Sequence, residues 1–137
     1  MEQRDYLMRQ IEELSLVLRR LFSRLLNGKD MGTHSISVVN QCFSEELGID
    51  LTRLSEIPDS QWINTLQTTM HFDPVNLEKL ADLLMAVGEH ELFSDRLSLY
   101  RKSMMIYQYL ETTEKTYSLE RNFNIQKLES LIDSEPR

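Results

Sequence analysis

The chain has 137 residues, which is the length of one domain with a substantial core and too short for two domains of ordinary size. Its composition, with 4 Gly, 3 Pro and many Leu, Glu, Met, Arg and Lys, is typical of helices and argues against a β-sandwich or barrel. The formal net charge of −7 argues against nucleic acid as the main partner, because binding to polyphosphate needs a basic surface. We therefore expect one all-α domain over residues 1–137, with no nucleic-acid partner.

The N-terminus and the cysteine content indicate a cytoplasmic protein. The chain begins MEQRDYLMRQ, which is charged from its second residue and lacks the apolar core of a signal peptide. No segment approaches the ~20 uninterrupted apolar residues of a membrane span, so we expect no membrane association. Cys42 is the single cysteine, so no intramolecular disulfide can form and a reducing compartment fits.

Positive charge is concentrated near the N-terminus. Residues 1–29 hold six Lys or Arg against four acidic residues, while residues 30–137 hold nine against eighteen. We interpret Arg19, Arg20 and Arg24 as cations near the C-terminal end of a helix, where the helix dipole favours them. A small nucleic-acid regulator that uses these arginines is the least favoured alternative.

Residues 1–27 are predicted to form a long amphipathic helix. Its apolar residues recur at alternating steps of four and three, which keeps them on one stripe. The stripe consists of Leu7, Ile11, Leu14, Leu18, Leu21 and Leu25. Gly28 supplies a stop after Asn27, because glycine accepts the left-handed conformation that closes a helix. We expect the stripe to pack on the rest of the chain, with a homodimer contact through part of the same face as the second possibility.

Residues 33–133 are predicted to form an array of antiparallel helical hairpins. Helices are expected at 33–47, from Asp59 or Ser60 to about 70, at 74–87, 91–116 and 119–132, with a loop or single turn at 49–58. Gly48 and Gly88 are expected to end helices. Asp73 and Pro74 predict a helix start, with the carboxylate as the cap and proline where no N–H is needed.

Part of this region resembles one tetratricopeptide hairpin. The stretch is LADLLMAVGEHELFSDRLSLYRKSMMIY, in which Val87-Gly88 stands where that family has Leu-Gly and Leu84 takes the large apolar position before it. The sequence departs from the pattern where Glu91 replaces a Tyr, where Tyr100 replaces a small residue, and at the end, where no Pro closes the second helix. The resemblance implies a helical repeat of tetratricopeptide-like form.

More of the chain resembles a group of uncharacterised bacterial proteins. The resembling pieces are QRDYLMRQIE at residues 3–12, ELGIDL at 46–51 and NLEKLA at 76–81. Those proteins look like a long N-terminal helix followed by paired tetratricopeptide-like helices. The resemblance implies a bacterial cytoplasmic protein and implies no reaction.

A search for catalytic or metal-binding patterns gives one weak candidate. His34, His71 and His90 are far apart and belong to no HExxH or CxxC-type set. His71 and Asp73 together could share a metal, although we favour Asp73 as a helix cap. Cys42 is interpreted as a packed residue. We therefore expect no cofactor, and keep an enzyme or metal site near His71, Asp73 and His90 as the alternative function.

The residues most suited to binding a partner lie in the segment 96–107. Tyr100 and Tyr107 are two turns apart on one helix face, with Met104 between them. The favoured interpretation is that these are core aromatics; the alternative is a groove for a partner helix or peptide, with Arg96 and Arg101 anchoring a carboxylate. The sequence thus predicts a non-catalytic protein- or peptide-binding scaffold that self-associates, if at all, through its first helix.

Overall fold

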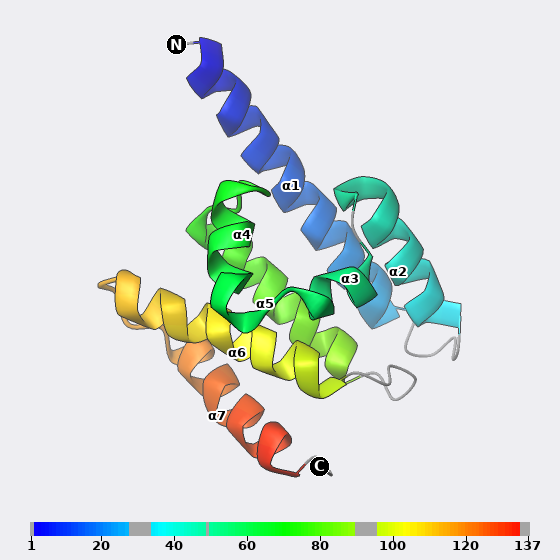
Figure 1. Ribbon diagram of the computed structural model, residues 1–137, viewed down its shortest axis with the longest axis vertical. Helices are drawn as coiled ribbons and strands as arrows, with labels where there is room; N and C mark the ends of the chain where they lie inside the picture. Colours follow the sequence, from blue (N-terminus) through cyan, green and yellow to red (C-terminus); the bar gives the residue numbers. More distant parts are fainter. Residues whose placement is uncertain (1, 28–33, 49, 90–95, 135–137) are drawn as a thin grey trace.

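The structure is a computed structural model and describes residues 2–27, 34–48, 50–89 and 96–134. Side chains are described for these residues except 2–4, 26–27, 34–39 and 42. Within the described ranges every regular element is a helix and none is a strand, which confirms the all-α prediction (Figure 1). The elements are α1 (Glu2–Asn27), α2 (His34–Leu47), α3 (Leu51–Glu56), η2 (Asp59–Gln61), α4 (Trp62–Thr68), α5 (Pro74–Gly88), α6 (Arg96–Thr113) and α7 (Leu119–Ser134).

Two helices begin at side-chain caps, of which Asp73 was predicted from the sequence. The Asp73 carboxylate accepts from the backbone N–H of Asn76 at 3.0 Å, and Pro74 occupies the first helical position of α5. The hydroxyl of Ser118 accepts from the N–H of Arg121 at 3.2 Å, where α7 begins after the expected break. In each case a side-chain oxygen satisfies a donor that has no partner within its own helix.

The expected loop or single turn at 49–58 contains the six-residue helix α3. Asp50 caps it by accepting from the N–H of Arg53 at 2.8 Å. The Asn40 side chain, on α2, accepts from the N–H of Leu51 at 2.9 Å. Asn40 is half-buried, and its side chain joins α2 to the start of α3.

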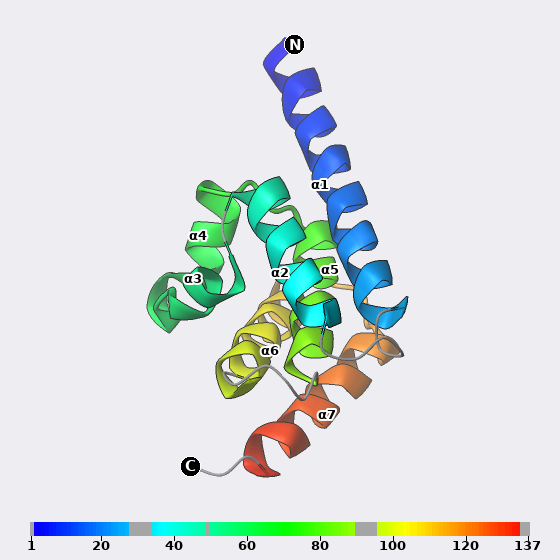
Figure 2. The same ribbon diagram turned by 90° about the vertical axis from the view of Figure 1, so that its right-hand side faces the viewer.

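The centre of the core is α5, which buries nine of its fifteen residues and lies between α1 and α6 (Figures 1 and 2). The Asn76 side chain donates to the Ile11 carbonyl oxygen at 3.0 Å, and Lys79 Nζ donates to the Ser15 hydroxyl at 2.5 Å. From the first of these contacts to the second, the residue number increases in both helices. Therefore α1 and α5 run in the same direction. Across the other side of α5, Ser103 of α6 donates to the Ala81 carbonyl oxygen at 2.7 Å.

The α1 stripe is covered along only part of its length. Leu18, Leu21 and Leu25 are fully buried, so packing on the rest of the chain is confirmed for this half of the helix. Leu7, by contrast, is 43 % exposed, and the first turns of α1 extend past the start of α5 in both views (Figures 1 and 2). No described element of the chain packs over those first turns.

Gly88 ends a helix, as predicted, but without a left-handed conformation. Gly88 is the last residue of α5, but among the described glycines only Gly48 has a positive φ, of 74°. Gly88 is instead required because Tyr100 packs on it: an added Cβ would lie 2.6 Å from Cε1 of that ring. Gly48 does end α2 in the expected way.

One helix boundary and one buried face also differ from expectation. The helix expected at 91–116 ends at Thr113, and its residues 91–95 lie outside the described part of the chain. In α7, Phe123 is 65 % exposed although its side chain is apolar. The buried face of α7 belongs to Arg121 and Leu128 instead, because carboxylates of α5 and α6 neutralise the arginine.

Candidate functional site

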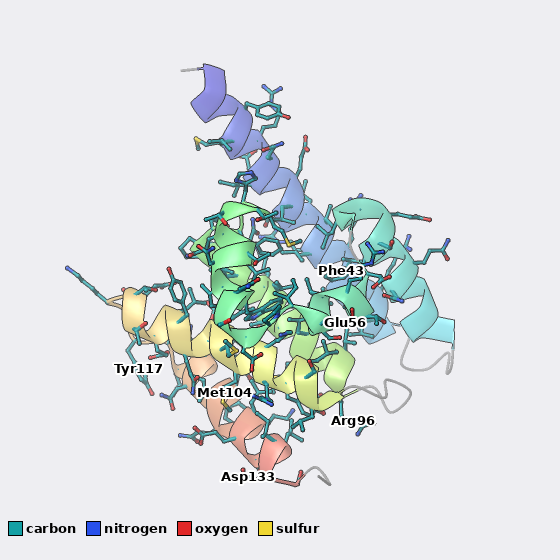
Figure 3. All side chains as sticks on the ribbon, viewed as in Figure 1. Phe43, Glu56, Arg96, Met104, Tyr117 and Asp133 are labelled. Atoms are coloured by element: carbon teal, nitrogen blue, oxygen red, sulfur yellow. The ribbon has the colours of Figure 1, made fainter. Side chains whose placement is uncertain are left out.

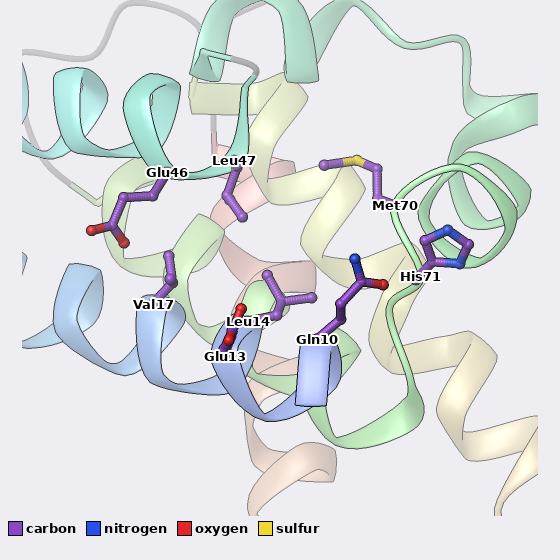
Figure 4. Close-up of a pocket in the computed structure, with 8 residues that line it drawn as sticks. All are labelled: Gln10, Glu13, Leu14, Val17, Glu46, Leu47, Met70 and His71. Atoms are coloured by element: carbon purple, nitrogen blue, oxygen red, sulfur yellow. The ribbon is translucent and has the colours of Figure 1, made fainter. Parts of the chain in front are cut away.

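A groove opens between α1, the end of α2 and the segment after α4 (Figure 4). It consists of two adjoining hollows of about 260 and 400 Å³ that share four residues, two of them Leu14 and Leu47. The groove is lined by Gln10, Glu13, Leu14, Val17, Glu46, Leu47, Gly48, Ile57, Thr65, Thr69, Met70, His71 and Phe72.

The groove has an apolar floor and an acidic rim. Leu14, Val17, Leu47 and Met70 are each half-buried, so their apolar surface is partly covered by the protein and partly open. Figure 4 shows Leu47 across the hollow from Leu14 and Met70 at one end. The rim carboxylates, Glu13 and Glu46, are exposed. Half-buried apolar side chains beside exposed charges are typical of a surface that binds a partner.

A left-handed residue shapes the end of the groove. His71 has a φ of 58°, in the region that asparagine, aspartate and histidine visit more readily than other non-glycine residues. This turn leaves His71 exposed at the groove while the next residue, Phe72, is only 4 % exposed. The turn is held by the N–H of Phe72, which donates to the Leu66 carbonyl oxygen at 2.9 Å.

One ion pair borders the groove. Arg20 Nη2 lies 3.0 Å from Glu46 Oε2 and joins α1 to α2. Both side chains are exposed, so the pair is screened by solvent and contributes little to stability. Glu13, on α1, is exposed to solvent. Because Glu46 is paired with Arg20, the negative charge that the rim presents to an entering molecule is chiefly that of Glu13.

The candidate metal residues His71 and Asp73 have different roles in the fold. Asp73 caps α5, as favoured from the sequence, while His71 is exposed at the groove. His90 and the side chain of His34 lie outside the described part of the structure. Within the described residues, no group of three or more His, Cys, Asp or Glu side chains is placed to hold a metal ion.

The partner-binding prediction is wrong for Tyr100 and Tyr107. These rings are 2 % and 0 % exposed, so the favoured interpretation as core aromatics is correct. Tyr100 donates its hydroxyl proton to the Gly88 carbonyl oxygen at 2.9 Å. Met104 is half-buried on α6, whereas Tyr117 is 66 % exposed after it (Figure 3).

The two arginines that were predicted to anchor a carboxylate, Arg96 and Arg101, do not lie beside an exposed aromatic surface. Arg101 is exposed, and its Nη2 lies 3.0 Å from Oδ2 of Asp59, the first residue of η2. Arg96 is half-buried at the start of α6. Because Tyr100 and Tyr107 are covered, the five predicted residues do not form one exposed surface.

A cluster of polar side chains joins α7 to the core. The Tyr107 hydroxyl donates to Asp82, and the Asn124 amide donates to the Tyr107 oxygen at 3.3 Å. Burial raises the pKa of Asp82 to about 6, outweighing the hydrogen bond from Tyr107, which lowers it. Burial likewise raises the pKa of the Tyr107 phenol, and the neighbouring carboxylate adds to this effect.

This cluster borders a hollow of about 260 Å³ between α1, α5, α6 and α7. Its apolar side is formed by Phe22, Met85 and Ala86. An ion pair between Lys127 Nζ and Glu89 Oε1, at 2.9 Å, spans α7 and the end of α5. The buried polar groups here are satisfied by one another and hold α7 in place.

The sequence contained only part of the signal for the groove. Leu14 was predicted within the α1 stripe, and Gly48 marked the end of α2. The joining of Leu14 to Leu47 and Met70 is a tertiary relationship that periodicity does not reveal. The left-handed turn at His71 carries no sequence signal of the kind that glycine gives.

Comparison of the chain with protein-family models, with curated proteins and with solved structures gives no match. Among the described helices, none combines the length and the apolar character that crossing a lipid bilayer requires.

Proposed function

We propose that this protein is a non-catalytic helical scaffold that binds an amphipathic helix or peptide in the groove. The observation that carries the proposal is the half-buried apolar floor between α1 and α2, bordered by exposed glutamates. A partner with apolar residues on one face and basic residues beside them matches both features. Helices bind in such grooves through anchors spaced at i, i+3, i+4 and i+7.

The two parts of the groove have different tasks in this proposal. Burial of the apolar floor, including Leu47 and Met70, supplies the favourable free energy, at about 25 cal/mol per Å² of apolar surface removed from water. Glu13 and Glu46 are exposed, so each ion pair that they form with a partner adds only about 0–1 kcal/mol. The charges therefore select a basic partner and its orientation more than they determine affinity.

We also propose that the helices form a tetratricopeptide-like array. The same direction of α1 and α5 supports this, because the first helices of successive hairpins run in parallel in such arrays. The contact of Tyr100 with Gly88 supports it too, since it brings α5 and α6 together at the glycine of the motif. The short helices α3, η2 and α4 between the two pairs are a departure from a regular repeat. A bacterial cytoplasmic setting remains part of the proposal and rests on the sequence resemblance.

A labelled helical peptide of about five turns tests the binding function. It carries leucines at i, i+3, i+4 and i+7 and lysines beside that stripe, and a scrambled peptide of identical composition is its control. We expect saturable binding by fluorescence anisotropy, with a Kd on the order of micromolar for the amphipathic peptide and much weaker binding for the scrambled one. Equal affinity for the two peptides would contradict the proposal.

A matched pair of charge reversals locates the binding site. Glu13→Lys changes the rim of the groove, whereas Glu129→Lys makes the same change on the exposed face of α7. Glu13→Lys should weaken binding severalfold more than Glu129→Lys at low ionic strength, and the difference should shrink as salt screens the charges. Equal weakening by both variants would show nonspecific attraction to an acidic protein.

A further inference from the structure

The N-terminal arm of α1, defined as residues 5–9, is an exposed apolar extension. Tyr6 is 61 % exposed, Leu7 43 % and Met8 53 %. The arm precedes Ile11, whose carbonyl oxygen is bound by Asn76 in the first turn of α5, and it extends past that helix (Figures 1 and 2). The exposure of three consecutive apolar side chains to water on a protruding helix is unfavourable, and it indicates a contact with another molecule.

The arm and the groove lie along one face of the same helix. Tyr6, Gln10, Glu13 and Val17 follow one another at steps of four, three and four, and Leu7 precedes Leu14 by two turns. The groove is lined by four of these residues, Gln10, Glu13, Leu14 and Val17. The exposed strip therefore continues from the arm into the wall of the groove. Because this wall is the continuation of the same helix, the arm of a given molecule cannot fold back into its own groove.

We propose that the occupant of the groove is the arm of a second copy of this chain, in a two-fold symmetric dimer with antiparallel α1 helices. The inference rests on the proposed function, because it uses the groove as a helix-binding site. With the helices crossing near Gln10, Leu7 of each copy reaches Leu14 of the other, and Tyr6 reaches Val17 of the other. The symmetry covers both arms and fills both grooves at once, as an isologous interface does.

Charge complementarity favours the second copy and the antiparallel direction. The arm ends at Arg9, which is exposed, and the groove rim begins at Glu13, which is also exposed. Reversing one helix about Gln10 brings Arg9 of each copy next to Glu13 of the other. A parallel pair in register would instead place Arg9 against Arg9 and glutamate against glutamate. The interface thus supplies the basic residue that the acidic rim requires.

Sedimentation equilibrium of the full chain over a wide range of concentration tests this inference. We expect a reversible dimer, with Leu7→Asp raising the dimer Kd by about tenfold or more, because it places a charge in the apolar contact. Leu119→Asp is the matched control, since Leu119 is 73 % exposed on α7 and is remote from the proposed interface. A wild-type chain that stays monomeric throughout, or a dimer that only Leu119→Asp dissociates, would overturn the proposal.

A charge swap separates this interface from other modes of association. Arg9→Glu alone and Glu13→Arg alone should each weaken the dimer severalfold, and the double variant should recover most of the loss, since it restores opposite charges across the two-fold axis. Failure of the double variant to recover, with helix content unchanged by circular dichroism, would contradict the antiparallel pairing. Arg9 and Glu13 are both exposed, so folding is not expected to change.

The amphipathic peptide distinguishes this inference from the proposed function. If both are right, the peptide dissociates the dimer as it occupies the groove. A monomer that binds the peptide would overturn the dimer and keep the scaffold. A dimer sensitive to Leu7→Asp that neither binds the peptide nor dissociates with it would keep the arm contact and overturn the groove as a site for other helices.

Discussion

Tyr100 and Gly88 are in direct contact where α5 and α6 approach each other. The hydroxyl of Tyr100 donates to the Gly88 carbonyl oxygen at 2.9 Å, and an added Cβ on the glycine would lie 2.6 Å from Cε1 of the ring. The carbonyl group at a helix end, which has no partner within its own helix, is satisfied by the side chain of the following helix. One residue without a side chain therefore fixes both the spacing and the polar contact of this pair.

We expect Gly88→Ala to destabilise the protein by about 1–3 kcal/mol, because the methyl group must displace a buried ring. Alanine would otherwise favour a helix by about 1 kcal/mol over glycine, so the sign of the effect tests the contact. Urea unfolding measures it, with Ser130→Ala, at an exposed position on α7, as a control that receives the propensity gain without the clash.

A double-mutant cycle with Tyr100→Leu checks the cause. Removing the ring should relieve most of the penalty of Gly88→Ala, so the double variant is more stable than the sum of the single effects predicts. Additive effects would show that the penalty has another origin.

Asp82 should make the stability of the protein fall as pH rises between about 4 and 6. Its pKa is raised from 3.8 to about 6 in the folded protein, chiefly by burial, so the folded state holds a proton that the unfolded chain has lost. The folded state is therefore favoured below pH 4 and bears the full penalty of the buried carboxylate above pH 6. We expect this penalty to be about 1–3 kcal/mol.

Asp82→Asn should flatten this pH dependence, because the amide oxygen still accepts from Tyr107 but carries no charge. The measurement is the free energy of unfolding by urea at pH 4, 5, 6 and 7, with Asp133→Asn, at an exposed carboxylate of α7, as the matched control. An unchanged slope in Asp82→Asn between pH 4 and 6 would show that another group titrates in this window.

The regular features of the fold were predictable because they depend on local sequence. The spacing of Leu18, Leu21 and Leu25 places them on one face whatever they contact, and Asp73 before Pro74 starts a helix through contacts within four residues. The same spacing could not assign Tyr100 and Tyr107 to the core or to a surface. That choice depends on α5, which supplies the glycine and the carboxylate that they contact.

Two residues of α7, near the end of the chain, show what local sequence could not predict. Phe123 has an apolar side chain and is exposed, while Arg121, two positions earlier, is 3 % exposed. Hydrophobicity predicts the reverse. The arginine is buried because three glutamates from α5 and the end of α6 surround it, and a sequence does not show which distant charges will meet. The groove escaped prediction for the same reason.

Arg121 should be a principal contact that holds α7. Its Nε and Nη2 lie 2.8 and 2.9 Å from the two carboxylate oxygens of Glu78, and these hydrogen bonds raise its pKa. We expect Arg121→Met to destabilise the protein by about 2–4 kcal/mol, because Glu78 and its neighbours lose their counter-ion while remaining partly buried.

Amide hydrogen exchange tests whether this loss of stability comes from detachment of α7. Arg121→Met should speed exchange in residues 119–134 more than in α5, because detachment of the last helix precedes unfolding of the core. Arg19→Met, a change of the same kind at an exposed position of α1, should leave both unchanged. Uniform acceleration across the chain would show that α7 unfolds together with the core.

Lys102 offers a test with an intrinsic probe, because its cation lies 4.9 Å from the ring centre of Trp62, the only tryptophan of the chain. The lysine is 2 % exposed, and its Nζ donates to the Ile57 carbonyl oxygen at 2.5 Å and lies 3.3 Å from Asp59 Oδ1. The indole N–H in turn donates to the Lys102 carbonyl oxygen at 3.0 Å.

We expect Lys102→Met to destabilise the protein by about 1–3 kcal/mol, because methionine keeps the packing against the ring but leaves the Ile57 carbonyl without its donor. The emission of Trp62 in the folded state should change as well, since the nearby charge is removed. Lys115→Met, at an exposed position, should change neither quantity. Unchanged emission together with lower stability would mean that the cation contributes through the Ile57 carbonyl and Asp59 alone, and not through the indole ring.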